Sequence, residues 1–207
     1  IFTAAMIDPL PEKQREFLAV MGLADEFTVE MAQDIMQTGD AAELLAALTG
    51  QNAFVRRLPD GVTYRFHHMM KECALRVFLT LPQERRNDCR RRFGAWYEQH
   101  RQYLHAMQAY YQSGDYHALL RVVQQDAGIL LSSLDPKNVL DFLDECPEDT
   151  LKAHPAALLV LMRSMFNWRN IPRMQELRQL LLTAIDEDTQ RSAEERGNLL
   201  GECDLIM

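Results

Sequence analysis

The sequence has no apolar run long enough to cross a membrane, because nothing in it approaches about 18 consecutive apolar residues. Its start soon becomes charged and has no basic lead, so we expect no signal peptide. The four cysteines lie far apart and form no Cys-x-x-Cys pair: Cys73, Cys89, Cys146 and Cys203. Isolated cysteines of this kind indicate reduced thiols, and we therefore expect a cytoplasmic protein without a membrane partner.

The common signatures of catalysis are also missing. There is no Gly-x-x-x-x-Gly-Lys-Ser/Thr phosphate loop, no His-Glu-x-x-His and no Gly-x-Ser-x-Gly. His67 and His68 lie near Cys73, but in a helix that begins at His68 the cysteine is not on the face of either histidine, so we expect no metal site. Carboxylates are spread along helical faces rather than paired. We expect no catalytic residues and no enzymatic activity.

What is present is typical of a globular protein. The 207 residues are 47% hydrophobic and 25% charged, and the net charge is −8. A negative chain is a poor nucleic-acid binder as a whole, although a local basic patch remains possible. The chain begins with Ile1, and residues 194–207 resemble a helix without a closing signal. We therefore expect an internal piece of a longer protein.

The strongest local pattern is a β-hairpin over residues 54–66. Two runs of strand-forming residues flank Pro59-Asp60-Gly61, in which proline sets φ and glycine accepts a positive φ. The alternation predicts one face made of Val62, Tyr64 and Phe66 and an opposite face made of Thr63, Arg65 and His67. A lone hairpin is marginal in water, so it must pack on neighbouring helices.

Three short helices are expected before the hairpin, over residues 10–22, 28–39 and 40–50. Gly22 and Gly39 would end the first two, and Thr28 and Asp40 would cap the second and third. Three short helices closed by one hairpin is the plan of a winged helix, which we place at residues 1–72.

The third helix occupies the place of a DNA recognition helix, yet it carries acidic Glu43 and no Lys or Arg. A helix in a major groove normally meets phosphates with basic residues, which argues against direct DNA binding. The hairpin does carry Arg56, Arg57 and Arg65.

Helices in pairs are expected after the hairpin, first over residues 68–81 and 84–101. The second of these has an arginine-rich side that is either a solvated face or a docking face for an acidic partner domain, made of Arg85, Arg86, Arg90, Arg91 and Arg92.

Further along, Ala106, Tyr110, Gly114-Asp115 and Ala118 fit a tetratricopeptide-type helix pair. Asn170 and Pro172 repeat the turn 55 residues later, with helices at 136–145 and 155–168 between them. The fold class is mainly α: a winged helix followed by an irregular tetratricopeptide-like arm at residues 73–207.

Three segments together resemble the middle of MalT-like transcriptional regulators, which are bacterial LuxR-type proteins of the STAND ATPase class. They are residues 64–70 (YRFHHMM), residues 90–100 (RRRFGAWYEQH), and Ala106 with Gly114-Asp115. The likeness extends from about residue 12 to residue 120. Met69-Met70 departs from the Leu-Phe that is commoner in these proteins.

The resemblance implies a place in a larger machine. Such regulators combine a nucleotide-binding domain, a winged helix, a helical arm, a helical sensor and a C-terminal DNA-binding helix-turn-helix. This chain would be the winged helix and the arm, with the nucleotide-binding and sensor domains of the same protein as partners, an unknown small-molecule inducer, and DNA contacted only by a domain outside the chain. ATP or ADP would belong to the full-length protein, with no cofactor in this piece.

The resemblance also implies that His67 contacts the β-phosphate of ADP, while the residue pattern alone allows a histidine that caps the helix or bonds to the hairpin backbone. Candidate contacts to partner domains are Arg56, Arg57, Arg65, Arg86, Arg90 and Arg91. Two other functions remain open: a DNA-binding winged helix with a helical dimerisation module, and a helical-repeat scaffold for protein partners.

Overall fold

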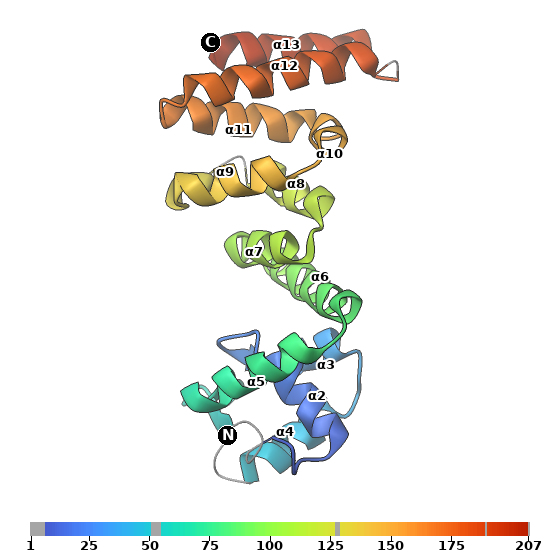
Figure 1. The fold of residues 1–207 in the computed structure, drawn as a ribbon, viewed down its shortest axis with the longest axis vertical. Helices are drawn as coiled ribbons and strands as arrows, with labels where there is room; N and C mark the ends of the chain where they lie inside the picture. Colours follow the sequence, from blue (N-terminus) through green and yellow to red (C-terminus); the bar gives the residue numbers. More distant parts are fainter. Residues whose placement is uncertain (1–6, 51–54, 127–128, 189, 207) are drawn as a thin grey trace. The chain divides into compact units, whose positions relative to one another are not determined.

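The computed structural model describes residues 7–50, 55–126, 129–188 and 190–206. The protein is mainly α-helical, with one small sheet (Figure 1). The chain forms two compact units, Ile1–Trp96 and Tyr97–Met207. From the sequence we predict a domain boundary after residue 72. Compact units do not by themselves define domains, so this boundary stays a prediction.

The first unit is a winged helix, as predicted. Its elements in chain order are α2 (Glu12–Met21), β1 (Phe27–Thr28), α3 (Val29–Met36), α4 (Ala41–Gly50), β2 (Val55–Arg57), β3 (Thr63–Phe66), α5 (His68–Thr80) and the larger part of α6 (Gln83–Gln99). The hairpin of β2 and β3 is confirmed, with Val55 opposite Phe66 and Arg57 opposite Tyr64. Phe54, which we expected in the first strand, lies outside the described residues.

A third strand was not predicted. β1 pairs with β3 and places Phe27 opposite Tyr64, so the strand order is β1-β3-β2. The Phe27 ring lies 5.1 Å from that of Phe66 and 6.2 Å from that of Phe17, which is fully buried on α2. Phe27 therefore joins the sheet to the helical core of this unit.

Two local predictions in this unit are wrong. Val62 is 60% exposed and lies in the turn rather than in the strand, because Asp60 accepts a hydrogen bond from its N–H. α3 ends at Met36 instead of reaching Gly39, because Gln37 adopts the left-handed conformation (φ 52°) and Thr38 N–H donates to Gln33 O. The Thr28 cap is confirmed, since its hydroxyl accepts from Met31 N–H.

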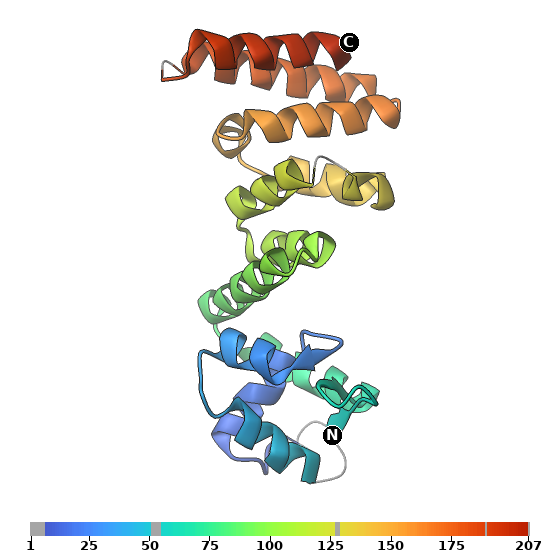
Figure 2. The same ribbon diagram turned by 180° about the vertical axis from the view of Figure 1, so that it is seen from behind.

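The second unit is an irregular helical repeat, and its helices follow the end of α6. They are α7 (Tyr103–Ser113), α8 (Tyr116–Gln125), the 3-10 helix η1 (Leu130–Ser133), α9 (Pro136–Glu145), α10 (Glu148–Lys152), α11 (Pro155–Asn167), α12 (Ile171–Glu187) and α13 (Ala193–Ile206). α7 packs on α8, and α11 packs on both α12 and α13, which lie side by side in both views (Figures 1 and 2). The short α10 was not predicted.

The predicted helix-pair turns are confirmed at both places. Gly114 is left-handed (φ 72°), and the Asp115 carboxylate accepts from Ala118 N–H at 3.0 Å. In the second turn the left-handed position is taken by Arg169 (φ 57°), and Asn170 accepts from Arg173 N–H at 3.3 Å. The core of this unit is continuous and includes Ala106, Leu119, Leu120, Leu158, Met162 and Leu181.

Candidate functional site

The hairpin exit carries a pocket of about 540 Å³. His67 links the end of β3 to the start of α5, with an extended backbone (φ −62°, ψ 141°). The lining comes from β2, β3, the start of α5 and the segment before β1: Asp25, Glu26, Arg56, Arg65, Phe66, His67, His68 and Lys71. Positive and negative side chains from segments distant in the sequence therefore meet around His67.

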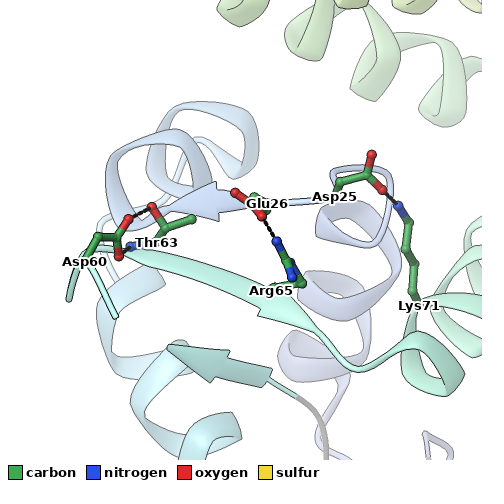
Figure 3. Close-up of polar contacts among 6 residues, drawn as sticks. All are labelled: Asp25, Glu26, Asp60, Thr63, Arg65 and Lys71. Carbon is green, nitrogen blue, oxygen red and sulfur yellow. Dashed lines mark hydrogen bonds and ion pairs between the residues drawn. The ribbon is translucent and has the colours of Figure 1, made fainter. Parts of the chain in front are cut away.

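Asp60 stabilises the turn of the hairpin whose strands lead to the pocket. Its carboxylate accepts a hydrogen bond from Val62 N–H at 3.0 Å. It also accepts from Thr63 N–H at 3.0 Å and from the Thr63 hydroxyl (Figure 3). These bonds, chiefly that of the Thr63 hydroxyl, lower the pKa of the Asp60 carboxyl. Gly61 supplies the positive φ of 74° that the turn requires.

Two ion pairs connect the segment before β1 to the rest of the site. Arg65 of β3 pairs with Glu26, and Lys71 of α5 pairs with Asp25 (Figure 3). All four side chains are at least partly exposed. A negatively charged ligand or partner entering the pocket would therefore compete with Asp25 and Glu26 for the two cations.

His67 is exposed and occupies the cap position of α5, but its side chain makes no capping hydrogen bond. His67 thus has the position of a helix cap, as the capping interpretation expects, but not its side-chain hydrogen bond. The N-terminus of α5, a helix of 13 residues, is next to it. Exposed backbone N–H groups at such a terminus favour an anion. The nucleotide contact implied for His67 stays a prediction.

The three arginines of the hairpin separate into two groups. Arg56 lies directly opposite Arg65 in the sheet, and both line the pocket. Arg57 pairs with Tyr64 and points to the other face of the strand, because side chains alternate along β2. The structure thus brings Arg56 and Arg65 to His67 and leaves Arg57 apart from them.

The arginines of α6 are not a uniform solvated face. Arg85 pairs with Glu16 of α2, and Arg92 donates to Ile35 O at 3.1 Å. Arg90 lies over the Phe78 ring at 5.5 Å, and its burial lowers its pKa. These arginines therefore hold α6 against the rest of its unit.

Of the other two arginines predicted as contacts on α6, Arg86 donates to Gln83 one turn earlier. Arg91 is exposed, with Asp88 Oδ1 at 3.9 Å from its guanidinium. Arg91 is thus the best placed of the α6 set to meet a partner. The proposed contact roles stay predictions.

Sequence reasoning missed the acidic half of the site. Asp25 and Glu26 carry no motif, and the pairing of β1 with β3 brings them to the hairpin. Their cation partner Lys71, on α5, was missed as well. A two-residue strand leaves almost no periodicity to detect, so no signal in the sequence identifies these residues.

Within the described ranges, no helix has both the length and the apolar character of a membrane span. Residues 3–87 match the family model of the MalT winged helix domain. Neither a curated protein nor a solved structure gives a match to the chain. The matched region covers β1, the hairpin and the pocket, and it ends within α6. The chain is thus similar to a MalT winged helix domain over this part, which supports its interpretation as a segment of a MalT-like regulator.

Proposed function

We propose that this chain is the regulatory, non-catalytic segment of a LuxR-type transcriptional activator of the STAND ATPase class. It couples nucleotide state and inducer sensing to DNA binding by a domain outside the chain. The observation that carries the proposal is the match of residues 3–87 to the MalT winged helix domain. The four free, buried cysteines fit a cytoplasmic location.

The winged helix would pack on the nucleotide-binding domain in the resting state, with His67 directed at the phosphates of bound ADP. Support comes from its exposed position at the α5 N-terminus, beside Arg56 in the pocket. An imidazole can donate to a phosphate oxygen, and neighbouring backbone amides add to the attraction. The nucleotide itself would be held by the other domain, so this segment needs no cofactor of its own.

The helical arm would relay the signal of a small-molecule inducer from a sensor domain of the same protein. Such a relay requires two global states with different contacts in each. Candidates for those contacts are Arg56, Arg57, Arg65, Arg86, Arg90 and Arg91. Of the three on α6, Arg91 is exposed, whereas Arg86 and Arg90 are half-buried. If Arg91→Glu left inducer response in the full-length protein unchanged, Arg91 would have no part in the relay.

Direct DNA binding by this segment is disfavoured by its charge. α4 has the position of a recognition helix, yet its first turn carries Glu43 and its ten residues include no Lys or Arg. The DNA reader is therefore proposed to lie elsewhere in the regulator. Salt-sensitive binding of duplex DNA by the 207-residue chain would contradict this.

The decisive experiment is to sequence the coding DNA on both sides of the segment. We expect a phosphate loop upstream and a helix-turn-helix downstream. Stop and start signals close to Ile1 and Met207 would overturn the proposal. With the full sequence in hand, His67→Ala is expected to speed ADP release at least about tenfold, whereas His105→Ala on α7 serves as a control that leaves release unchanged.

A further inference from the structure

Two histidines of the second unit are in contact with each other. His117 lies in the first turn of α8, and His154 is the residue before α11. His117 Nδ1 lies 3.1 Å from His154 Nε2, and the ring centroids are 5.3 Å apart. His117 is exposed and His154 is half-buried. Neither residue belongs to the hairpin-exit pocket.

We propose that His117 and His154 form a binding site for one divalent transition metal ion of the Zn²⁺ type. Metal–nitrogen bonds of about 2.0–2.1 Å to two nitrogens 3.1 Å apart give a nitrogen–metal–nitrogen angle of roughly 100°. That value lies between the square or octahedral angle and the tetrahedral one. The separation of the two nitrogens thus suits two adjacent ligands of one ion.

The charges around the pair permit a cation. Arg121, one turn after His117, is held by the Glu98 carboxylate at 3.0 Å and 2.9 Å. Lys152, near His154 in the chain, pairs with Glu187 at 3.3 Å. Both neighbouring positive charges are therefore compensated by carboxylates, which reduces their repulsion of a metal ion.

A metal ion at the pair would compete with a proton. A histidine binds a metal through its neutral ring, so a proton competes with the ion. The metal would replace the proton that otherwise links the two ring nitrogens.

The number of protein ligands limits the affinity of the site for the metal ion. Among the residues that the structure describes, no group of three or more His, Cys, Asp or Glu side chains is arranged around a metal. Water would fill the remaining positions, so we expect micromolar affinity, weaker than that of a four-ligand structural zinc site. Occupancy would tie α8 to the link between α10 and α11 and stabilise the second unit.

Isothermal titration of the 207-residue chain with Zn²⁺ at pH 7.5 tests the proposal. We expect a site of one ion per chain whose affinity falls at least tenfold in both His117→Gln and His154→Gln. His105→Gln, on the neighbouring α7, is the matched control and should leave the affinity unchanged.

Thermal unfolding gives a second measurement. Zn²⁺ should raise the Tm of the wild type and of His105→Gln, and should leave both pair variants unshifted. Zinc affinity that is equal in the wild type and both pair variants would mean that the ion binds elsewhere, and absence of binding at 1 mM would equally overturn the proposal. Because His117 is exposed, His117→Gln decides the question if His154→Gln fails to fold.

Discussion

At the residue scale, Gly22 shows how one missing side chain permits a close approach of two helices. It follows the last residue of α2 with an ordinary helical φ of −61°, so space rather than conformation requires glycine here. A Cβ at this position would lie 2.6 Å from Ala74 Cβ of α5 and 2.9 Å from Leu18 O. The sequence correctly indicates a helix end at Gly22 but not the contact with Ala74.

We therefore predict that Gly22→Ala lowers the free energy of unfolding by about 1–3 kcal/mol, because α2 and α5 must move apart. Gly39→Ala is the matched control, since a Cβ there meets nothing within 4 Å. Urea unfolding followed by circular dichroism measures both variants. Equal stability of the two variants would show that α2 and α5 can accommodate the added methyl group without loss.

Glu98, also at the residue scale, collects hydrogen bonds from three side chains near the end of α6. Its carboxylate accepts from Tyr110 Oη at 2.8 Å, from Arg121 Nε and Nη2, and from Gln125 Nε2 at 3.2 Å. Arg121 first, and then Tyr110 and Gln125, lower the pKa of the Glu98 carboxyl. The ionised form is thus preferred in the folded state.

A lowered carboxyl pKa stabilises the fold above the unfolded pKa of about 4.3 and loses its effect as the pH falls through the folded pKa. Glu98→Gln should therefore cost about 1–3 kcal/mol at pH 7 and progressively less between about pH 5 and pH 3. Urea unfolding at several pH values tests this, with Glu202→Gln on the exposed side of α13 as the control. A cost that does not change with pH would assign the effect to packing.

At the scale of elements, two turns of the helical arm solve the same problem with different residues. Gly114 and Arg169 both adopt a positive φ, at 72° and 57°. In each turn the N–H of this residue and the N–H of the residue after it donate to carbonyls of the preceding helix in the same pattern: Gly114 to Tyr111, Asp115 to Tyr110, Arg169 to Phe166 and Asn170 to Met165. Only the first turn has glycine, which adopts a positive φ without strain.

The comparison predicts opposite effects of two substitutions. Arg169→Gly should raise the free energy of unfolding by up to about 1 kcal/mol, because Arg169 is exposed and its strain is relieved. Gly114→Ala should lower it by about 1 kcal/mol, since alanine is strained at a positive φ while its Cβ meets no neighbour within 4 Å. Thermal unfolding of the two variants and wild type measures both. A loss of stability in Arg169→Gly would reveal a favourable contribution from its side chain.

The elements that could be predicted are those with strong local signals. Pro59-Asp60-Gly61 predicts the hairpin, Gly114-Asp115 and Asn170 predict the turns, and the prolines predict the starts of α9 and α11. What could not be predicted depends on distant partners. β1 has only two residues and forms through pairing with β3, and the ion pair of Arg85 with Glu16 spans 69 positions.

The candidate site shows the same limit. The alternation of the hairpin predicts that Arg65 and His67 share one face, and the resemblance also predicts His67 as a site residue. The predicted end of α3 at Gly39 was wrong because glycine usually takes the left-handed position after a helix, whereas here Gln37 takes it. The end of α3 at Met36 could therefore not be predicted from the position of glycine.

At the scale of the whole molecule, the proposed function depends on a nucleotide-binding domain outside the chain, and this has a direct consequence for ADP. The hairpin-exit pocket contains Arg56, His67 and the N-terminus of α5, but Arg65 and Lys71 are already paired with Glu26 and Asp25. The sequence contains no phosphate loop whose backbone amides would surround a diphosphate. A few contacts on an exposed surface cannot supply tight binding.

We therefore predict that isothermal titration of the 207-residue chain with ADP gives a Kd weaker than about 100 µM, that is, less than about 5.5 kcal/mol of binding free energy. The same chain extended through an upstream nucleotide-binding domain should bind ADP at least about a hundredfold more tightly, and His67→Ala should remove part of that gain. The shorter chain carrying His67→Ala is the control, because the substitution should change its weak binding little. Sub-micromolar ADP binding by the 207-residue chain, abolished by His67→Ala, would place the nucleotide site within this segment and contradict the division of roles between the two domains.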